Sequence, residues 1–512
     1  MSGFAVIFNK QGRSELEDMF QRIAHRGLYI SGKFEYKRVL MAQNYLKSDI
    51  CLKNDKFLEQ DENQVPAFTP KLPDLRICYD GQMGNWAERA KPSGEAEGPF
   101  KEERLFLNLY KKYGSQMFEY LDDAIFAFVI SDGENLFAAR DLLGIKTLFY
   151  GRKNGGLYLS SELKSLIGIT DDIHEFPPGY YMDSTGTLFR FAELPKSQPE
   201  ILHSDPNEMA ETIRDIIQRS FQNRVNFEAP TGSLLSGGID SSVIAWMAAD
   251  AFREKFGKDA RLKTFALGVG ESQDIICARL MADYIRSNHH ELIVDLDQIL
   301  AALPLVIWSL ESFDPSLVRS SVSNYLISKY AKEQGIEVLL SGEGGDEVFC
   351  GYLYLKDFPA EELFAQQMKC IGFLHHNASL RLDRMNLCNS IRVVTPLISG
   401  ELLKYAMTIP SEYKQKPDGN QKIEKWIFRK AYEDVLPNEI VWRLKQEFSQ
   451  GSGSANVLPA YFEAMIQDEE LKKAQSSYPI VRSKEELYYF KIFIEHFGTG
   501  KAVETVGQWV SL

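Results

Sequence analysis

The first part of the chain, residues 1–194, alternates short apolar runs with turn residues. Phe4–Phe8, Ala124–Ile130 and Leu157–Leu159 are rich in β-branched or aromatic residues, and Gly, Asp or Asn stands near their ends. Residues 102–112 instead repeat apolar side chains at helical spacing. This pattern predicts an α+β domain in which helices pack against sheets.

Residues 195–206 are polar and contain three prolines, so they predict a linker. Beyond the linker, residues 207–512 open with an amphipathic helix at 208–221 and then alternate strand and helix. The predicted strands are 232–235, 262–267, 291–294 and 337–340, and the predicted helices are 241–254, 273–286 and 322–334. Such alternation is typical of a parallel α/β sheet, and the chain beyond residue 360 is mostly helical by pattern.

The net charge of −13 argues against a general nucleic-acid or anionic-membrane partner, because such binders usually carry a basic face. No basic segment followed by an apolar core opens the chain, and no apolar run reaches the roughly 20 residues of a membrane helix. The six cysteines lack metal-binding spacing and are expected to be reduced thiols. These features predict a cytoplasmic protein.

A glycine-rich loop follows the predicted strand at 232–235. Ser236-Gly237-Gly238 comes directly after the strand, and Ser241-Ser242 opens a helix. Glycine lets the backbone approach a phosphate closely, and a helix N-terminus supplies free N–H donors. Asp240 would repel phosphate unless Mg²⁺ lies between them. The loop therefore predicts a nucleotide site, although a simple strand-to-helix turn remains an alternative, and the Walker A pattern is absent.

A second loop, Ser341–Glu347, follows the strand at 337–340 and carries three glycines and three carboxylates. Ligands of an open α/β sheet bind at the carboxyl ends of its strands, so both loops are expected to face one crevice. Asp240 and Asp346 would then hold Mg²⁺ between them. The alternative for these residue types is an exposed acidic turn.

With both loops in view, the chain resembles the glutamine-dependent asparagine synthetase family over essentially its whole length. Further matching segments are Thr264–Gly268, His289–Glu291, Leu310–Asp314, Arg319, Lys425–Arg429 and Val441–Ser449, and in the first part Ala24–Gly27, Arg140–Ile145, Ser161–Lys164 and Glu175–Gly179. The resemblance implies an N-terminal αββα sandwich of the Ntn type at 1–194. It implies a parallel-sheet ATP pyrophosphatase domain of the adenine-nucleotide α-hydrolase type at 207–512.

The family adenylates a carboxylate with ATP, releases pyrophosphate, and lets an amine attack the acyl-adenylate. Carried over by resemblance, Lys445 would stabilise charge on the phosphate, and Glu343 would take the proton of the attacking amine. Mg²⁺ would be bound by Asp240 and Asp346. The residues expected around ATP are Leu235, Ser236, Gly237, Gly238, Asp240, Ser241, Ser242, Leu267 and Gly342.

The N-terminal part departs from the family's glutaminase pattern. The family's cysteine nucleophile is replaced by Ser2, whose hydroxyl is far less ionised than a thiol. Its oxyanion Asn-Gly and following Glu correspond to Asp80–Gln82, where a carboxylate would repel a developing oxyanion. The residues that bind the glutamine carboxylate and amino group correspond to Tyr45 and Glu102. We therefore predict an inactive glutaminase domain; a serine amidase is the alternative.

The synthetase part departs at one segment, where the resemblance places Arg392, Val394 and Ser399 in positions that are Glu, Arg and Asp in the family. Because the family has these residues near its substrate pocket, an acid other than plain aspartate is predicted. The expected activity joins a small carboxylic acid to ammonia or a small amine without glutamine. Rival hypotheses are intramolecular amide closure of the β-lactam synthetase type and a catalytically silent scaffold subunit. The sequence does not fix the oligomeric state, and a homodimer is one alternative.

Overall fold

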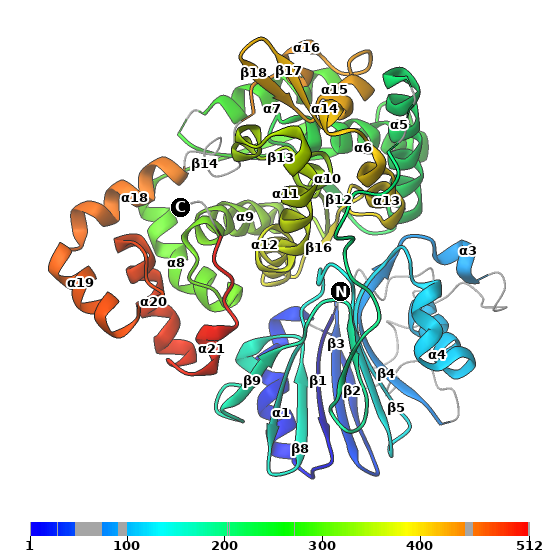
Figure 1. Cartoon of the computed structure of the whole chain (residues 1–512), viewed down its shortest axis with the longest axis vertical. Coiled ribbons are helices and arrows are strands. Elements are labelled where there is room, and N and C mark those ends of the chain that lie inside the picture. Colours follow the sequence, from blue (N-terminus) through cyan, green and yellow to red (C-terminus); the bar gives the residue numbers. More distant parts are fainter. Residues whose placement is uncertain are drawn as a thin grey trace. The chain divides into compact units, whose positions relative to one another are not determined.

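The computed structural model describes residues 2–27, 29–46, 74–90, 100–201, 203, 205–270, 272–445 and 454–509. Cys51, two residues of the predicted linker (Leu202 and Ser204) and the end of one family motif (residues 446–449) lie outside these ranges. The chain forms two compact units, Met1–Leu194 with Phe497–Val506, and Pro195–His496 with Gly507–Leu512 (Figure 1).

Two antiparallel sheets form the N-terminal unit, with strand orders β2-β3-β1-β8-β7-β9 and β11-β10-β6-β5-β4. Their strands are β1 Ser2–Phe8, β2 Tyr29–Tyr36, β3 Val39–Tyr45, β4 Arg76–Met83, β5 Ala124–Ser131, β6 Leu136–Arg140, β7 Phe149–Lys153, β8 Gly156–Ser160, β9 Asp172–Glu175, β10 Tyr180–Met182 and β11 Leu188–Arg190. The helical segments are α1 Arg13–Gln21, η1 Ala24–Arg26, α3 Trp86–Ala90, α4 Lys101–Tyr113, η4 Gly114–Tyr120, η5 Leu163–Ser165 and α21 Lys501–Glu504.

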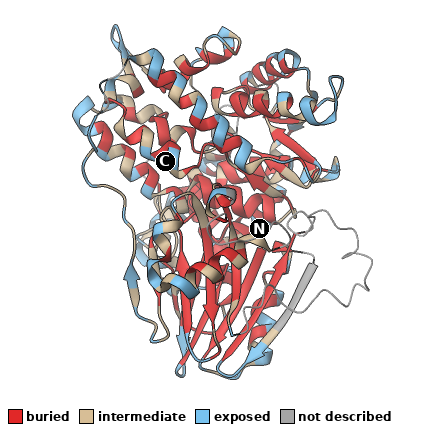
Figure 2. Cartoon of the chain, turned by 90° about the vertical axis from the view of Figure 1, so that its right-hand side faces the viewer, coloured by how far each residue is buried: buried red, intermediate tan, exposed pale blue. Residues whose placement is uncertain are grey.

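The two sheets of this unit face each other, and a helix covers each outer side. Alternate residues of β1, such as Phe4, Val6 and Phe8, pack against Ala127 and Val129 of β5 in one buried cluster. The other side of β4 and β5 packs on α4, and α1 packs on β1 and β3. Figure 2 shows these strands as mostly buried. The layers α1, sheet, sheet and α4 confirm the predicted αββα sandwich.

A parallel sheet of order β14-β13-β12-β15-β16 is the centre of the C-terminal unit, and each adjacent pair of its strands is parallel. The strands are β12 Thr231–Leu234, β13 Lys263–Val269, β14 Asn288–Val294, β15 Val338–Leu340 and β16 Arg392–Val394, and β17 Gln415–Asp418 and β18 Gln421–Glu424 form a hairpin. This confirms the predicted α/β class.

The helices of the C-terminal unit up to the second loop are α5 Pro206–Arg224, α6 Ile239–Phe256, α7 Gln273–Ile285, α8 Leu296–Leu310, α9 Pro315–Glu333 and α10 Gly345–Phe349. They are followed by η6 Leu353–Asp357, α11 Ala360–Gly372, η7 Leu374–His376, α12 Ala378–Leu387, α13 Gly400–Thr408, α14 Ser411–Lys414, α15 Trp426–Ala431, α16 Asn438–Val441, α18 Ser454–Met465, α19 Asp468–Ser477 and α20 Lys484–Phe497.

The segment between β14 and β15 holds two helices, where the sequence pattern predicted one at 322–334. α8 was missed because it is apolar on most of its surface, so it lacks the polar stripe that marks an amphipathic helix. α9 begins earlier than predicted, at Pro315, because the Asp314 side chain accepts a hydrogen bond from the N–H of Leu317 and caps the helix.

Within the described residues no single helix is long and apolar enough to cross a membrane. α8 and α9, bent by 109° at their junction, pass that test together by length and composition alone.

Candidate functional site

The two glycine loops lie side by side at the carboxyl ends of β12 and β15, which are neighbours in the sheet. Gly237 has a φ of +69°, a conformation that side chains disfavour, and it lets the chain turn from β12 into α6. A Cβ on Gly342 would lie 2.4 Å from the carbonyl carbon of Asp240. The loops therefore pack against each other through glycine, and they hold Asp240 and Asp346 close together.

The carboxylates of Asp240 and Asp346 converge on one ammonium group. The Nζ of Lys425 lies 2.5 Å from Oδ2 of Asp240 and 2.5 Å from Oδ1 of Asp346. The Nζ of Lys445 donates to the other oxygen of Asp346 at 2.7 Å. Burial alone would raise the pKa of Asp346, but these two lysines hold that pKa well below its usual value. The Asp346 carboxylate is therefore ionised.

The pKa of Lys445 is shifted in the opposite direction. Burial would lower the pKa of its ammonium, but the nearby charges of Asp346 and Asp240 raise that pKa above its usual value. Its side chain is only 15% exposed, so Lys445 is a charged lysine inside the site. Sequence reasoning placed Lys445 beside the phosphates by resemblance alone, and the structure brings it to the predicted aspartates.

Lys425 is a site residue that sequence reasoning quoted only as part of a motif. It stands just before α15, is 1% exposed, and has a left-handed backbone with a φ of 54°. A Cβ on Gly351 would lie 1.9 Å from the Cε of Lys425, so a glycine is needed there to make room. The available signal was charge balance: two carboxylates expected on facing loops favour more than one nearby cation.

Glu343 forms an ion pair with Arg381 of α12, and both side chains are largely buried. Arg381 was not predicted, because its position before the Asp383-Arg384 pair of α12 gives no local sign that the helix faces the second loop. The guanidinium fixes the carboxylate of Glu343 at the wall of the site. Tyr352 is a neighbour on the same wall.

A cavity of about 200 Å³ brings these groups together within the C-terminal unit. It is lined by ten predicted residues, namely Leu235, Ser236, Gly238, Asp240, Ser241, Leu267, Gly342, Glu343, Asp346 and Lys445. The other two residues predicted around ATP, Gly237 and Ser242, are not among the described residues that line the cavity. Gly237 forms the turn, and Ser242 is fully buried in α6. Further wall residues come from α9, α12 and Trp509.

The altered segment at 392–399 does not belong to this wall. Among the described residues that line the cavity, Arg392, Val394 and Ser399 do not occur. Val394 packs in the apolar core, and the Ser399 hydroxyl accepts a hydrogen bond from Leu402 N–H and caps α13. Arg392 and Val394 belong to β16 and Ser399 caps α13, so none of the three lines this cavity, and their place near the acid stays a prediction.

In the N-terminal unit, Ser2 is 1% exposed at the start of β1. Its hydroxyl donates to the carbonyl of Tyr79 at 2.6 Å and accepts from Nε2 of Gln43 at 2.9 Å. Its backbone N–H donates to Oδ1 of Asp80 at 3.1 Å. Neither a carbonyl nor a carboxamide is a general base, so these two contacts do not activate the hydroxyl.

Asp80 is held in a buried network of charges. Arg26 donates to Asp80 and to Glu162, each at 2.8 Å, and Lys146 lies 3.4 Å from Asp80. Lys164 pairs with Glu162. The described side chains of these five residues are at most 4% exposed. Asp80 thus serves as the anionic partner of a basic cluster beside Ser2.

The other two replaced positions of this unit also have local partners. The ring of Tyr45 lies 5.3 Å from the ring of Phe100, measured between centroids. The carboxylate of Glu102 accepts a hydrogen bond from the hydroxyl of Tyr79 at 2.6 Å. Tyr45 carries no cation for a substrate carboxylate, and Glu102 is bonded to the protein itself.

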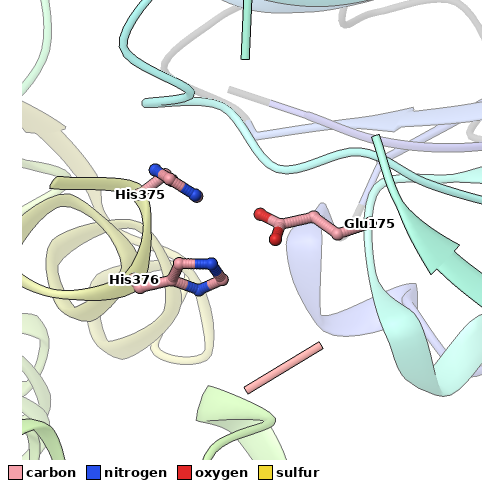
Figure 3. A group of neighbouring side chains, drawn as sticks. All are labelled: Glu175, His375 and His376. Atoms are coloured by element: carbon pink, nitrogen blue, oxygen red, sulfur yellow. The ribbon is translucent and has the colours of Figure 1, made fainter. Parts of the chain in front are cut away.

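Figure 3 draws one further group of side chains. His375 and His376 belong to η7 in the C-terminal unit, with ring centroids 4.1 Å apart, and Glu175 belongs to β9 in the N-terminal unit. Within its own unit Glu175 accepts a hydrogen bond from Arg140 at 2.7 Å. Glu175 therefore already has a cationic partner in the N-terminal unit.

The chain thus combines a two-layered antiparallel sandwich with a parallel-sheet domain, and paired aspartates and lysines lie at the strand ends of that parallel sheet. The family model for asparagine synthase matches residues 212–370 and 356–499, and the model for a glutamine amidotransferase domain matches residues 1–196. The chain belongs to the asparagine synthetase family.

Three relatives show the extent of this similarity, and each is named as an asparagine synthetase that hydrolyses glutamine. A probable one from Schizosaccharomyces pombe is 34% identical over 79% of this chain and 78% of its own length. A probable one from Dictyostelium discoideum is 32% identical over 100% of this chain and 96% of its own. The enzyme from Gallus gallus is 31% identical over 86% and 84%. The chain is accordingly an ATP-dependent carbon–nitrogen ligase.

Proposed function

We propose that this ligase takes its amine from ammonia or a small amine and does not hydrolyse glutamine. The observation that carries the proposal is the engagement of Asp80 with Arg26 and with the N–H of Ser2, at the place where a developing oxyanion would need donors. The proposal treats residues 1–194 as an inactive glutaminase-like domain, 195–206 as a linker and 207–512 as the synthetase domain.

The nucleotide is proposed to bind along the two loops. Its phosphates would face Ser236–Ser242, where α6 begins with free N–H groups, and its adenine would lie beside Leu235, Leu267 and Gly342. In the first step an oxygen of the acid attacks the α-phosphorus of ATP, and the bond to pyrophosphate breaks. Lys445 and Lys425 offset the charge that develops on the phosphates.

The residues at the loops fit a divalent cation. Asp240 and Asp346 supply the hard carboxylate oxygens that Mg²⁺ prefers, and Oδ1 of Asp240 is buried without a hydrogen-bond partner. Both carboxylates also approach one cation already, the ammonium of Lys425. Asp240 and Asp346 would hold Mg²⁺, which when bound neutralises and orients the phosphates of ATP.

In the second step the amine nitrogen attacks the carbonyl carbon of the acyl-adenylate, and the bond to AMP breaks. The nitrogen must lose a proton as the amide forms. Glu343 lines the cavity and its carboxylate is held by Arg381, so it is the proposed acceptor of that proton. The presence of this glutamate favours an amine that enters from outside over intramolecular closure.

The carboxylic acid is proposed to differ from plain aspartate. The replacements at Arg392, Val394 and Ser399 predicted an acid other than plain aspartate, but these residues lie outside the described cavity wall. A panel of acids that includes aspartate decides between aspartate and a different acid.

The test is pyrophosphate release with Mg²⁺ across amino and dicarboxylic acids, each with glutamine, ammonium or simple amines. We expect release that depends on one acid and on ammonium or an amine. Glutamate release from glutamine should be absent, and Ser2→Ala should leave the ammonium-dependent rate unchanged. Glutamine-supported turnover that Ser2→Ala abolishes would overturn the proposal. Absence of turnover with every acid would favour the silent scaffold.

A further inference from the structure

The cavity wall contains two kinds of residues. The charged ones include Glu343, Arg381, Asp346 and Lys445. The apolar ones include Leu235 after β12, Phe265 and Leu267 of β13, and Ile327 of α9, and β13 flanks β12 on the side opposite to β15. A planar, largely apolar ring system fits these apolar residues better than a small charged acid does.

One polar side chain, Asn324, belongs to the same wall as Ile327. Residues 316, 320, 324 and 327 of α9 all line the cavity, and their spacing places them on one face of the helix. Asn324 is 3% exposed, and its Nδ2 is buried without a hydrogen-bond partner. An unpaired buried amide is costly, so a native structure that keeps one invites a search for its ligand.

The helix that carries Asn324 packs on the strand that supplies apolar wall residues. α9 contacts β13, and the ring of Tyr330, six residues beyond Asn324, lies 6.2 Å from the ring of Phe265 between centroids. Phe265 in turn is hydrogen-bonded through its carbonyl to the N–H of Leu235 at 2.8 Å. The carboxamide therefore stands on the helix that faces the strands proposed to flank adenine.

We propose that Asn324 reads the adenine base of ATP. A carboxamide offers one donor and one acceptor side by side, and the edge of adenine offers a ring nitrogen beside the N6 amino group, so the two form a paired hydrogen bond. Guanine carries a carbonyl oxygen in place of the N6 amino group and presents the wrong pattern. Asn324 is thus a specificity residue for the nucleotide. This inference rests on the proposed placement of ATP at the two loops.

The test compares ATP with the triphosphate of purine riboside, which lacks the N6 amino group, and with GTP. In the wild-type protein we expect kcat/KM to favour ATP over both. Asn324→Leu keeps the size of the side chain and removes both hydrogen-bonding groups. It should lower kcat/KM for ATP about tenfold or more and bring the ratio of ATP to the purine analogue near one.

A matched control lies one turn earlier on the same face. The hydroxyl of Ser320 donates to the carbonyls of Ser316 and Leu317 at 3.1 Å and 3.0 Å, so it is satisfied by its own helix. Ser320→Ala should therefore keep the wild-type ratio of ATP to the purine analogue. Thermal unfolding of each variant, compared with the wild type, separates a change in recognition from a loss of fold.

Direct binding of Mg-ATP and of the purine analogue, measured by calorimetry without any acid, makes the test independent of turnover. If the wild type binds ATP but turns over with no acid, the proposed function fails while the role of Asn324 is still measured. If Asn324→Leu binds both nucleotides as the wild type does, the inference is overturned. A rise in KM for the acid with KM for ATP unchanged would also overturn it.

Discussion

Both units contain a buried cluster of opposite charges beside a predicted reactive group, but the two clusters differ in access. In the N-terminal unit the cluster is Arg26, Asp80, Lys146, Glu162 and Lys164, with side chains at most 4% exposed. In the C-terminal unit it is Asp240, Glu343, Asp346, Lys425, Arg381 and Lys445, which lines a cavity; the three carboxylates and Lys445 are 15–20% exposed.

The difference separates charges that hold a fold from charges that can act on a ligand. In the N-terminal cluster Asp80 contacts Ser2, Arg26 and Lys146 of the protein itself, so an entering substrate would have to displace a buried cation. In the C-terminal cluster the carboxylates reach a cavity, and Oδ1 of Asp240 is left without a hydrogen-bond partner. That cluster is able to exchange protein partners for a nucleotide and a cation.

The largest effect is expected when a charge is removed from the C-terminal cluster, which lines the cavity. Lys445→Ala removes a charged, buried ammonium from the phosphate end, and we expect pyrophosphate release to fall by about 10²–10³-fold, as for a lost electrostatic donor. The measurement is the steady-state rate with the best acid and ammonium. Lys430→Ala removes a lysine that pairs with Glu433, two residues beyond the end of α15, and it should keep the rate. Equal rates in Lys445→Ala and wild type would remove Lys445 from the site.

Removing a charge from the buried N-terminal cluster should lower the stability of the protein more than its ligase activity. Arg26→Met leaves Asp80 and Glu162 buried without their shared cation, which is expected to cost about 3–5 kcal/mol of unfolding free energy. Urea denaturation measures it. Arg13→Met, which removes an exposed pair with Glu35, should cost about 1 kcal/mol or less. If both variants lower the free energy of unfolding by the same amount, the N-terminal cluster has no special structural role.

Lys414 extends the comparison of the two clusters, because it is a buried lysine whose hydrogen-bond partner is neutral. Its Nζ donates to Oε1 of Gln367 at 2.8 Å, and burial lowers the pKa of its ammonium to about 8 from 10.5. The unfolded state then binds more protons between these pH values, so the free energy of unfolding should rise with pH from about 8 to 10.5. The expected gain is about 3 kcal/mol. The measurement is urea denaturation at several pH values.

Lys414→Met is the control for this pH dependence. It removes the titrating group, so its stability should exceed that of the wild type below pH 8, and the difference should vanish as the pH approaches 10.5. A difference between the two proteins that stays constant with pH would show that Lys414 is not depressed in the folded state.

The smallest expected effect is at Ser2. Because its hydroxyl is bonded to a carbonyl and a carboxamide and lies beside the Asp80 carboxylate, Ser2→Cys alone should not produce glutaminase activity. Glutamate release from glutamine should stay at background in the wild type and in the variant. Glutamate release by the Ser2→Cys variant would show that the N-terminal cluster still forms a working oxyanion site.

Much of the site was predictable because its loops follow apolar strands. Ser236–Ser242 and Ser341–Glu347 end β12 and β15, and parallel neighbours bring strand ends together, so Asp240 and Asp346 were paired correctly from local pattern. Sequence reasoning failed where helix packing decides. It did not assign a role to Arg381 of α12 or Asn324 of α9, although both line the cavity.

The sequence by itself therefore determined the two domain classes, the two loops and the carboxylates they carry, because strand periodicity, glycine and helix starts are local features. Only the tertiary structure decided which residues complete the site. Lys425 reaches Asp240 across 185 positions of sequence, and Arg381 reaches Glu343 across 38. Such contacts depend on how whole helices pack on the sheet, and no residue pattern near either partner encodes that packing.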